Sequence, residues 1–522
     1  KKIKYPKNDL MQEMLQSEDI CAVIPRRPEM NMTIRAFCLP FWIFSIIVLF
    51  VSNTGAWGDE SESFNVQLVG KHPLQGRSSY QPIPHKYGDR WILFVGHHAG
   101  ESLNTQTGEL EVNGMSVLDI TDATKPELLS HVPPTSPASG TQHVQVCDGS
   151  SLPEGNPDKT YLLRTNGLLS YELFDVTDPA EPKFLSTIAE TGHSSRPESS
   201  RGTRETHKFQ WECITGIAYF NGTPKGWRVT RLLQAFDLSN PNNPHHIRDF
   251  GLIGWEPGAQ GAFPDYEISG LHQPFIVGNR MFLGYGSGNN GVLQILNTEK
   301  FLKGNPSSGD PFEPTPENLL YPQIARLDMP SYWGVHTAKP IYDIPVPEGS
   351  YHERLGIKDL LIVVSEAGRD ARRCQATPDV MFLIDITEEA TPFPISSFQV
   401  PAQSGDFCER GGRFGPHSVH DAFHPKFDKT LVILSYFNAG IRVVDIRDPF
   451  QPVEVGYFIP ETTSSTVEDC ITINETEHCN RAIQTNNVNI DDRGFIYAVD
   501  RANTGLHIVE LTGTARSILV LP

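Results

Sequence analysis

Histidines are the residues of this sequence whose type and placement could do chemistry. They recur along most of the chain, each near the start of a run of strand-forming residues, at His85, His143, His207, His272, His336, His417 and His420. Neutral imidazole ligates Zn, Cu, Fe or Ni, and it is the usual proton-transfer group near neutral pH. The pattern therefore points to metal binding or acid–base chemistry, provided that the fold brings these histidines together.

A repeated phrase predicts how residues so far apart are positioned. In each clear copy an apolar β-forming run ends in Asp and is followed by a polar turn with proline, as in Leu173–Pro182 and Val443–Pro452. With two degenerate copies the phrase occurs seven times, anchored at Asp119, Asp175, Asp237, Asn297, Asp385, Asp445 and Glu510. The steps between anchors are 56, 62, 60, 88, 60 and 65 residues.

These steps fit one all-β architecture. A four-stranded propeller blade needs roughly 40–50 residues, so the sequence predicts a seven-bladed β-propeller of four-stranded antiparallel blades with loop insertions. A sandwich or a barrel is the competing all-β fold, but neither predicts seven copies of one phrase.

The Asp of each phrase has a structural interpretation of its own. An Asp side chain can accept hydrogen bonds from backbone N–H groups two residues further on, and Pro presets the following turn. Proline also blocks further pairing at an outer strand. We therefore predict that these Asp residues form turns and do not bind ligands.

The propeller fold predicts a histidine-lined channel. Innermost strands run side by side around the axis, so equivalent positions in different blades converge there. The expected metal ligands or proton-transfer groups are His143, His207, His272, His336 and His417. Further candidates for the channel are His85, His98, His420, Gln484, Asn486, Asn487 and Arg164, with Glu366 and Tyr436 as catalytic candidates. The alternative is a polar, water-filled channel whose His, Gln and Asn side chains do no chemistry.

Charge and hydropathy set the broad class. The 522-residue chain carries a formal net charge of −19, which argues against nucleic-acid binding because that requires basic patches. The one long apolar run, residues 35–52, follows Met30 and Met32 and leads into small residues, a layout typical of a secretory signal peptide. A membrane anchor is the alternative for this run.

The expected organisation has four parts. Residues 1–29 are an upstream extension outside the mature protein, 30–57 the signal peptide or anchor, 58–78 an N-terminal segment, and 79–522 the propeller. A closed ring needs one strand from the N-terminal segment or from the tail, and the candidates are Phe64–Leu68 and Ser517–Leu521.

Cysteine usage agrees with export. Six of the eight cysteines follow the predicted signal peptide, and an even number in an exported chain suggests disulfides. Sequence proximity favours three of the many pairings: Cys147 with Cys213, Cys374 with Cys408, and Cys470 with Cys479. No pair has the close CxxC spacing of a zinc site.

The repeated phrase resembles the LVIVD repeat of exported or surface proteins that are predicted β-propellers. The match covers roughly residues 79–515, and it includes Met115–Pro126, Ala235–Pro244 and Leu383–Pro392 as well as the blocks His207–Gly216 and Gln484–Gly505. The resemblance implies an exported propeller but no particular reaction. A fainter, fold-level likeness is to selenium-binding protein, a methanethiol oxidase whose propeller has histidine-rich metal sites; fold alone does not fix function.

Two functions follow as hypotheses. The first is a ligand- or protein-binding scaffold that uses the channel mouth and loops. The alternative is a metal-dependent enzyme, an oxidoreductase or hydrolase, with Cu, Zn or Fe held by the histidines. The expected partners are a small molecule or a protein at the mouth, with no nucleic acid and no stable membrane insertion after signal cleavage. We expect a monomer that is secreted, periplasmic or on the cell surface.

Overall fold

The computed structural model describes residues 60–135, 140–189, 206–261, 270–287, 290–345, 356–368 and 371–519. The predicted upstream extension and signal peptide, with the alternative anchor at 35–52, lie outside these residues. Within the described part of the chain, no helix is both long enough and apolar enough to cross a membrane.

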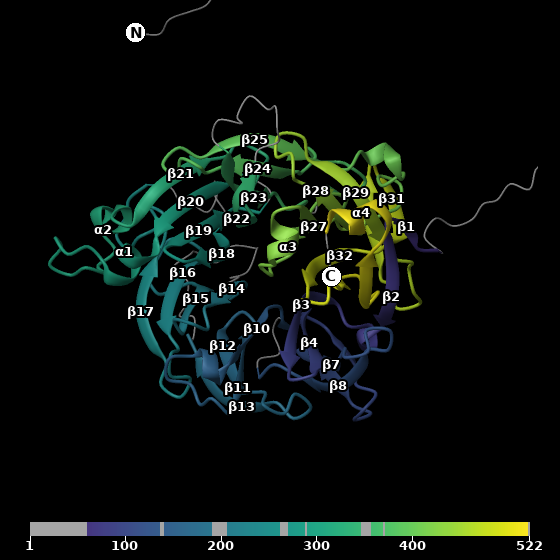
Figure 1. Cartoon of the computed structure of the whole chain (residues 1–522), viewed down its shortest axis with the longest axis horizontal. Helices are drawn as coiled ribbons and strands as arrows, with labels where there is room; N and C mark the ends of the chain where they lie inside the picture. Colours follow the sequence, from purple (N-terminus) through teal and green to yellow (C-terminus); the bar gives the residue numbers. More distant parts are fainter. Residues whose placement is uncertain are drawn as a thin grey trace, which may run out of the picture. The chain divides into compact units, whose positions relative to one another are not determined.

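Seven four-stranded antiparallel sheets follow one another along the chain and form the blades of a β-propeller, as predicted (Figure 1). From the channel outward, blade one consists of β3 (Ser79–Tyr87), β4 (Arg90–His98), β7 (Met115–Asp119) and β8 (Glu127–Val132), and blade two of β10 (Val144–Asp148), β11 (Thr160–Asn166), β12 (Ser170–Asp175) and β13 (Lys183–Ile188). Blade three consists of β14 (Phe209–Trp211), β15 (Ile217–Gly222), β16 (Leu232–Asp237) and β17 (His245–Phe250). Blade four consists of β18 (Leu271–Val277), β19 (Arg280–Tyr285), β20 (Val292–Asn297) and β21 (Gln323–Asp328).

The last three blades have the same order. Blade five consists of β22 (Thr337–Pro345), β23 (Ile357–Val364), β24 (Met381–Asp385) and β25 (Phe393–Phe398). Blade six consists of β26 (Ser418–Val419), β27 (Leu431–Ser435), β28 (Ile441–Asp445) and β29 (Val453–Ile459). Blade seven consists of β32 (Thr485–Ile490), β33 (Ile496–Asp500), β34 (Leu506–Leu511) and β2 (Val66–His72). The repeated phrase is the third strand of every blade. Each innermost strand contacts the innermost strand of the next blade, and β32 of blade seven contacts β3 of blade one, so the ring is closed.

The N-terminal segment closes the ring at two blades. Strand β2 pairs antiparallel with β34 and supplies the outer strand of blade seven, whereas β1 (Glu62–Phe64) pairs with β29 as a fifth strand of blade six. Ser517 and Ile518 of the tail lie in helix α4 (Gly513–Ile518) and not in a strand.

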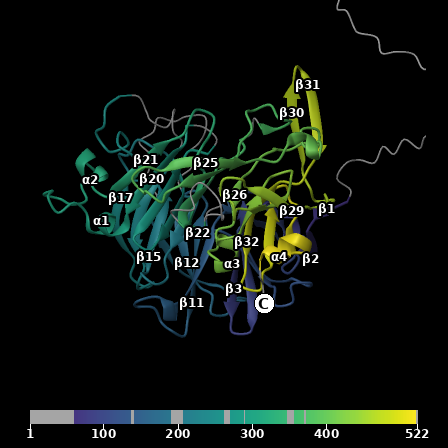
Figure 2. The same ribbon diagram turned by 45° about the horizontal axis from the view of Figure 1, so that its top comes forward.

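Smaller elements are inserted between the blade strands. They are the hairpins β5 (Glu101–Leu103) with β6 (Leu110–Val112) and β30 (Glu468–Ile473) with β31 (Thr476–Arg481), strand β9 (Gly140–Thr141), and helices α1 (Thr298–Lys303), α2 (Pro316–Leu320) and α3 (Pro425–Asp428). The β30–β31 hairpin stands away from the blades in Figure 2. Apolar side chains of neighbouring blades pack face to face, as where Phe94 and Val117 of blade one meet Leu162 and Phe174 of blade two.

The three disulfides join the pairs that sequence proximity favours. Cys147 of β10 is bonded to Cys213, which follows β14, so this bridge ties blade two to blade three. Cys374 is bonded to Cys408 between two loops, and Cys470 is bonded to Cys479 across the β30–β31 hairpin. All three predicted pairings are confirmed.

The Asp residues of the phrase make the predicted turns. In five blades one carboxylate oxygen accepts the backbone N–H two residues on, at 2.9 Å for Asp119, 3.0 Å for Asp175, 2.8 Å for Asp237, 2.9 Å for Asp385 and 3.0 Å for Asp445. Each turn reverses the chain from the third strand to the outer strand of its blade.

A substitution at one of these turns should have a modest effect on stability. Asp237→Ala removes the acceptor for the Ser239 N–H, and we expect a loss of about 1 kcal/mol in the free energy of unfolding, measured by urea denaturation. Asp237→Asn keeps an acceptor oxygen and should lose less. Equal losses in the two variants would contradict the assignment of this side chain as a turn-forming acceptor.

Candidate functional site

One mouth of the channel opens into a cavity of about 510 Å³. All seven blades contribute to its lining, in order through Tyr80, Gln142, His207, His272, His336, His417 and Arg501. Ser78, His98, Thr206, Arg231, Ser287, Glu366 and Arg413 complete the polar lining. The volume is in the range of small-molecule sites.

Four histidines from consecutive blades form a cluster in this cavity, here called the imidazole cluster: His207, His272, His336 and His417. The Nε2 atoms of His207 and His272 lie 2.8 Å apart. The rings of His272 and His336 stack with centroids 3.4 Å apart, and those of His336 and His417 are 4.8 Å apart. The cluster therefore brings together residues separated by more than two hundred positions in the sequence.

Hydrogen bonds of the main chain position three of the four imidazoles. The N–H of His336 donates to Val364 and that of His417 donates to Ser435, each at 2.9 Å, just before the innermost strands β22 and β26. The carbonyl of His272 accepts a hydrogen bond from the Asn221 side-chain amide at 2.6 Å. These contacts fix where the rings enter the channel before any ligand is bound.

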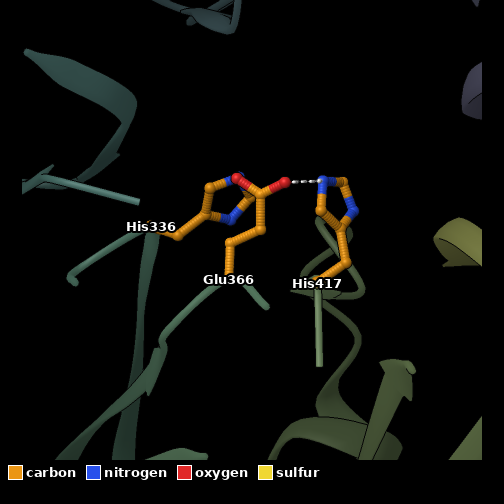
Figure 3. A group of neighbouring side chains, drawn as sticks. All are labelled: His336, Glu366 and His417. Atoms are coloured by element: carbon orange, nitrogen blue, oxygen red, sulfur yellow. Dashed lines mark ion pairs between the residues drawn. The ribbon is translucent and has the colours of Figure 1, made fainter. Parts of the chain in front are cut away.

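Glu366 lies between two of the imidazoles, on the loop that follows β23 (Figure 3). Its carboxylate oxygens lie 3.5 Å from His336 Nε2 and 3.8 Å from His417 Nε2. One ligand atom from each of these three residues lies within 4.8 Å of the other two. Ligand atoms around a tetrahedral zinc ion are about 3.4 Å apart, so the spacing is close to that of a metal site.

The tautomer of His417 strengthens this interpretation. Its Nδ1 lies against the backbone carbonyl of Asn486, which can only accept, so Nδ1 carries the proton and Nε2 presents a lone pair. That lone pair faces the Glu366 carboxylate, another acceptor. Arg413 donates to the same carboxylate oxygen at 3.2 Å, and a metal ion between Glu366 and His417 would also satisfy the imidazole lone pair. Ligating histidines commonly donate their other N–H to a backbone carbonyl.

His207 is oriented in the same way. Its Nδ1 lies 2.6 Å from Gln142 Oε1, and Gln142 Nε2 lies 3.1 Å from His98 Nδ1. The remaining nitrogen of His207 therefore presents a lone pair to the cavity. The Tyr80 hydroxyl lies 3.0 Å from this Nε2 and 3.3 Å from His272 Nε2.

Burial keeps the deeper imidazoles neutral. Desolvation, reinforced by the positive charge of neighbouring groups, holds the pKa of His272 and of His417 well below the usual range. Desolvation also lowers the pKa of His336 to about 4, although the Glu366 carboxylate acts in the opposite direction. Neutral imidazoles have the free lone pair that a metal ion requires.

A buried histidine outside the cavity gives a test of this effect on stability. Burial, and after it the charge of Lys71, lowers the pKa of His507 from 6.5 to about 4. Below pH 6.5 the unfolded chain takes up a proton at His507, whereas the folded protein does so only near pH 4. Between these values the free energy of unfolding therefore decreases as the pH is lowered, by up to about 1.4 kcal/mol per pH unit for this group.

We therefore expect His507→Leu to reduce the slope of the unfolding free energy against pH between pH 6.5 and 4, because about one proton fewer is taken up on unfolding. The measurement is urea denaturation at several pH values. His246→Ala, which removes an exposed histidine of β17, is the matched control. A His507→Leu variant with the slope of the parent protein would contradict the assignment.

Several predicted channel residues lie elsewhere. His85, at the far end of β3, lies 3.1 Å from Asp148 and outside the cavity. Arg164 forms a fully buried ion pair with Glu172, at 2.7 Å, and Tyr436 is buried in an apolar cluster, where its hydroxyl accepts the Val400 N–H. These three side chains stabilise the blades and do not reach the cavity.

Two predicted histidines lie deeper than the imidazole cluster. His143 Nε2 is 3.9 Å from Asp421 and has no hydrogen-bond partner within the described part of the protein, and His420 lies 3.2 Å from Asp428. Gln142, one residue before His143, takes the cavity position in blade two. Successive residues of a strand point to opposite sides, so a shift of one residue moves a side chain out of the cavity.

The polar residues of blade seven lie beside the cluster. Asn486 contacts both His417 and His98, and the Asn487 side chain bonds with that of Asn486 at 2.7 Å. The Gln484 side chain accepts the Arg413 N–H at 3.0 Å. Tyr80, Gln142 and Arg231 were not predicted, because no sequence pattern marks them as channel residues.

Comparisons with known proteins leave the family of this chain undefined. No protein-family model matches the sequence, and no curated protein matches it. Among solved structures, the crystal structure of Sqt1 from Chaetomium thermophilum is similar with a TM-score of 0.43 and 9% sequence identity, over 87% of this chain and 100% of that chain. The assignment of seven blades rests on the strand pairing of this chain itself.

Proposed function

We propose that the protein is a metal-binding β-propeller that takes a small ligand at its channel mouth. The observation that carries the proposal is the grouping of His336, His417 and Glu366, whose carboxylate oxygens lie 3.5 Å and 3.8 Å from the two Nε2 atoms. His336, His417 and Glu366 are the proposed ligands, and His207 and His272, whose Nε2 atoms share a hydrogen bond at 2.8 Å, lie beside them. Imidazole nitrogen with carboxylate oxygen suits Zn, Cu or Fe.

The first experiment is elemental analysis of purified protein combined with metal titration. Protein as isolated should contain close to one transition-metal ion per chain, or should bind one Zn²⁺ or Cu²⁺ after treatment with a chelator. Metal-free protein whose thermal unfolding ignores both ions would refute the proposal. That result would leave the scaffold interpretation, in which loops and the channel mouth hold a partner protein.

A metal-dependent enzyme is the second candidate function. The observation that favours it is the cavity beside the proposed ligands, because catalytic metal sites keep an open position for water or substrate whereas structural sites are closed. Burial raises the pKa of Tyr80 far above its usual range, so its hydroxyl, which contacts two of the imidazoles, would keep its proton and act as a hydrogen-bond donor there. Hydrolysis of a model ester by the Zn²⁺-loaded protein, or oxygen uptake by the Cu²⁺-loaded protein with a thiol, would support it if His336→Ala abolishes the activity.

Export remains part of the proposal. Disulfides persist in oxidising compartments, and the three bridges of this protein support a secreted, periplasmic or surface location. The likeness to LVIVD-repeat proteins, carried by the third strands of the blades, points the same way. Mass analysis of the mature N-terminus after secretion would test the predicted cleavage near residue 57.

A further inference from the structure

Three arginines stand around the imidazole cluster. Arg231 precedes β16 in blade three, Arg413 precedes β26 in blade six and Arg501 follows β33 in blade seven, and all three line the cavity. Glu366 is the one carboxylate among the described residues of that lining. Three guanidiniums therefore stand with one carboxylate in the lining, in a chain whose formal net charge is −19.

Two of these guanidiniums are held in place by the surrounding structure. Arg413 and Arg501 lie over the ring of the same residue, Phe437, at 5.2 Å and 5.3 Å from its centroid. Arg413 also pairs with Glu366 at 3.2 Å, and Arg501 lies 3.3 Å from His98 Nε2. Stacking and hydrogen bonds of this kind fix a guanidinium in advance of ligand binding, which reduces the entropy lost when a ligand binds.

Apart from Ala99, Leu168 and Gly368, the rest of the lining is polar. Ser78, Thr206, Ser287 and Gln142 offer hydroxyl and amide groups, and Tyr80 is the one aromatic residue with a hydroxyl at the cavity among the described residues. Such a lining suits a compact polar ligand better than an extended apolar one. Guanidinium groups match planar and tetrahedral oxyanions through paired N–H donors.

We propose that the cavity captures a small oxyanion, a carboxylate or a phosphate, anchored by Arg231, Arg413 and Arg501 and lying against the proposed metal. This inference rests on the proposed function for the position of the metal, but the arginine anchors exist without it. The local positive charge also explains how a strongly acidic protein could attract an anion to one end of its channel, and such attraction weakens as salt rises.

The test is calorimetric titration of two probes, malate and inorganic phosphate, into metal-free protein, with malate repeated on Zn²⁺-loaded protein. The test variants are Arg501→Gln and Arg231→Gln. Arg501→Lys keeps the positive charge but lacks the paired N–H donors of the guanidinium. Arg516→Gln in α4 is the matched control for net charge. Circular dichroism and thermal unfolding establish that each variant is folded.

We expect binding to the parent protein to weaken with salt, and roughly 10- to 100-fold weaker binding in each Gln variant. Arg501→Lys should fall between parent and Gln variant, and Arg516→Gln should bind as the parent does. The probe that binds more tightly identifies the class of oxyanion. Tighter malate binding by the Zn²⁺-loaded protein would place the anion against the metal.

The two proposals can fail separately. Stoichiometric metal with no binding of either probe, or with binding that the Arg→Gln variants leave unchanged, would overturn the oxyanion inference and leave the metal proposal intact. Arginine-dependent binding to a protein that takes up no metal would overturn the metal proposal and support the oxyanion site alone.

Discussion

Replacing His336 and His417 together by alanine should abolish stoichiometric metal binding. The two Nε2 atoms flank Glu366 at 3.5 Å and 3.8 Å, so the double variant loses two of the proposed ligands, while the ion pair of Glu366 with Arg413 remains. A metal present at 100 times its dissociation constant stabilises the folded protein by about 2.7 kcal/mol. That increment, seen as a rise in Tm on adding Zn²⁺ to metal-free protein, should vanish in the double variant.

Three comparisons make this result specific. Glu366→Gln keeps the shape of the side chain but removes its charge, and we expect metal affinity to fall at least about tenfold, since each 1.4 kcal/mol is a factor of ten. His245→Ala with His246→Ala removes the same number of imidazoles from the exposed start of β17. A double variant at His336 and His417 that keeps one tightly bound metal per chain would show that the ion lies elsewhere.

Deleting Glu62–His72 should prevent formation of a stable propeller. Strand β2 covers the outer edge of blade seven and β1 covers that of blade six, so both edges would be exposed without them. Val66, buried against both blades, would be lost from an apolar cluster. The stability of a whole folded domain is only about 5–15 kcal/mol, and an uncovered strand edge promotes aggregation.

The measurement is cooperative thermal unfolding together with the fraction of soluble monomer. A chain beginning at Glu60, which keeps both strands, is the control. A gentler change in the same strand is Gly70→Ala, because a Cβ at Gly70 would come within 2.1 Å of the Ala123 carbonyl oxygen. A truncated chain that unfolds cooperatively within a few degrees of the control would show that ring closure does not depend on the N-terminal strands.

Much of the fold could be read from local patterns. The phrase ending at Asp119, Asp175 or Asp445 combines a strand with its following turn, and both are decided by residues adjacent in sequence. Each of these Asp residues accepts the backbone N–H two residues on, as an Asx turn requires. The disulfide pairings also followed from proximity, because cysteines close in sequence are often close in space.

The site was only partly predictable. His207, His272, His336, His417 and Glu366 are among the residues singled out from the sequence, and the structure brings them into one cavity. The prediction placed His143 beside them, but Gln142 lines the cavity in blade two, whereas the His143 side chain faces Asp421 at 3.9 Å. Tyr80 and Arg231 carried no distinguishing pattern, since their role depends on neighbours from other blades.

The amino-acid sequence by itself determined the repeating strand-and-turn unit and therefore the number of blades, because those features depend on interactions within a few tens of residues. Only the tertiary structure decided which side chains share the channel mouth, which nitrogen of each imidazole faces it and which arginines surround it. These properties depend on the depth at which each innermost strand enters the ring, and that depth is set by packing between blades that are distant in the chain.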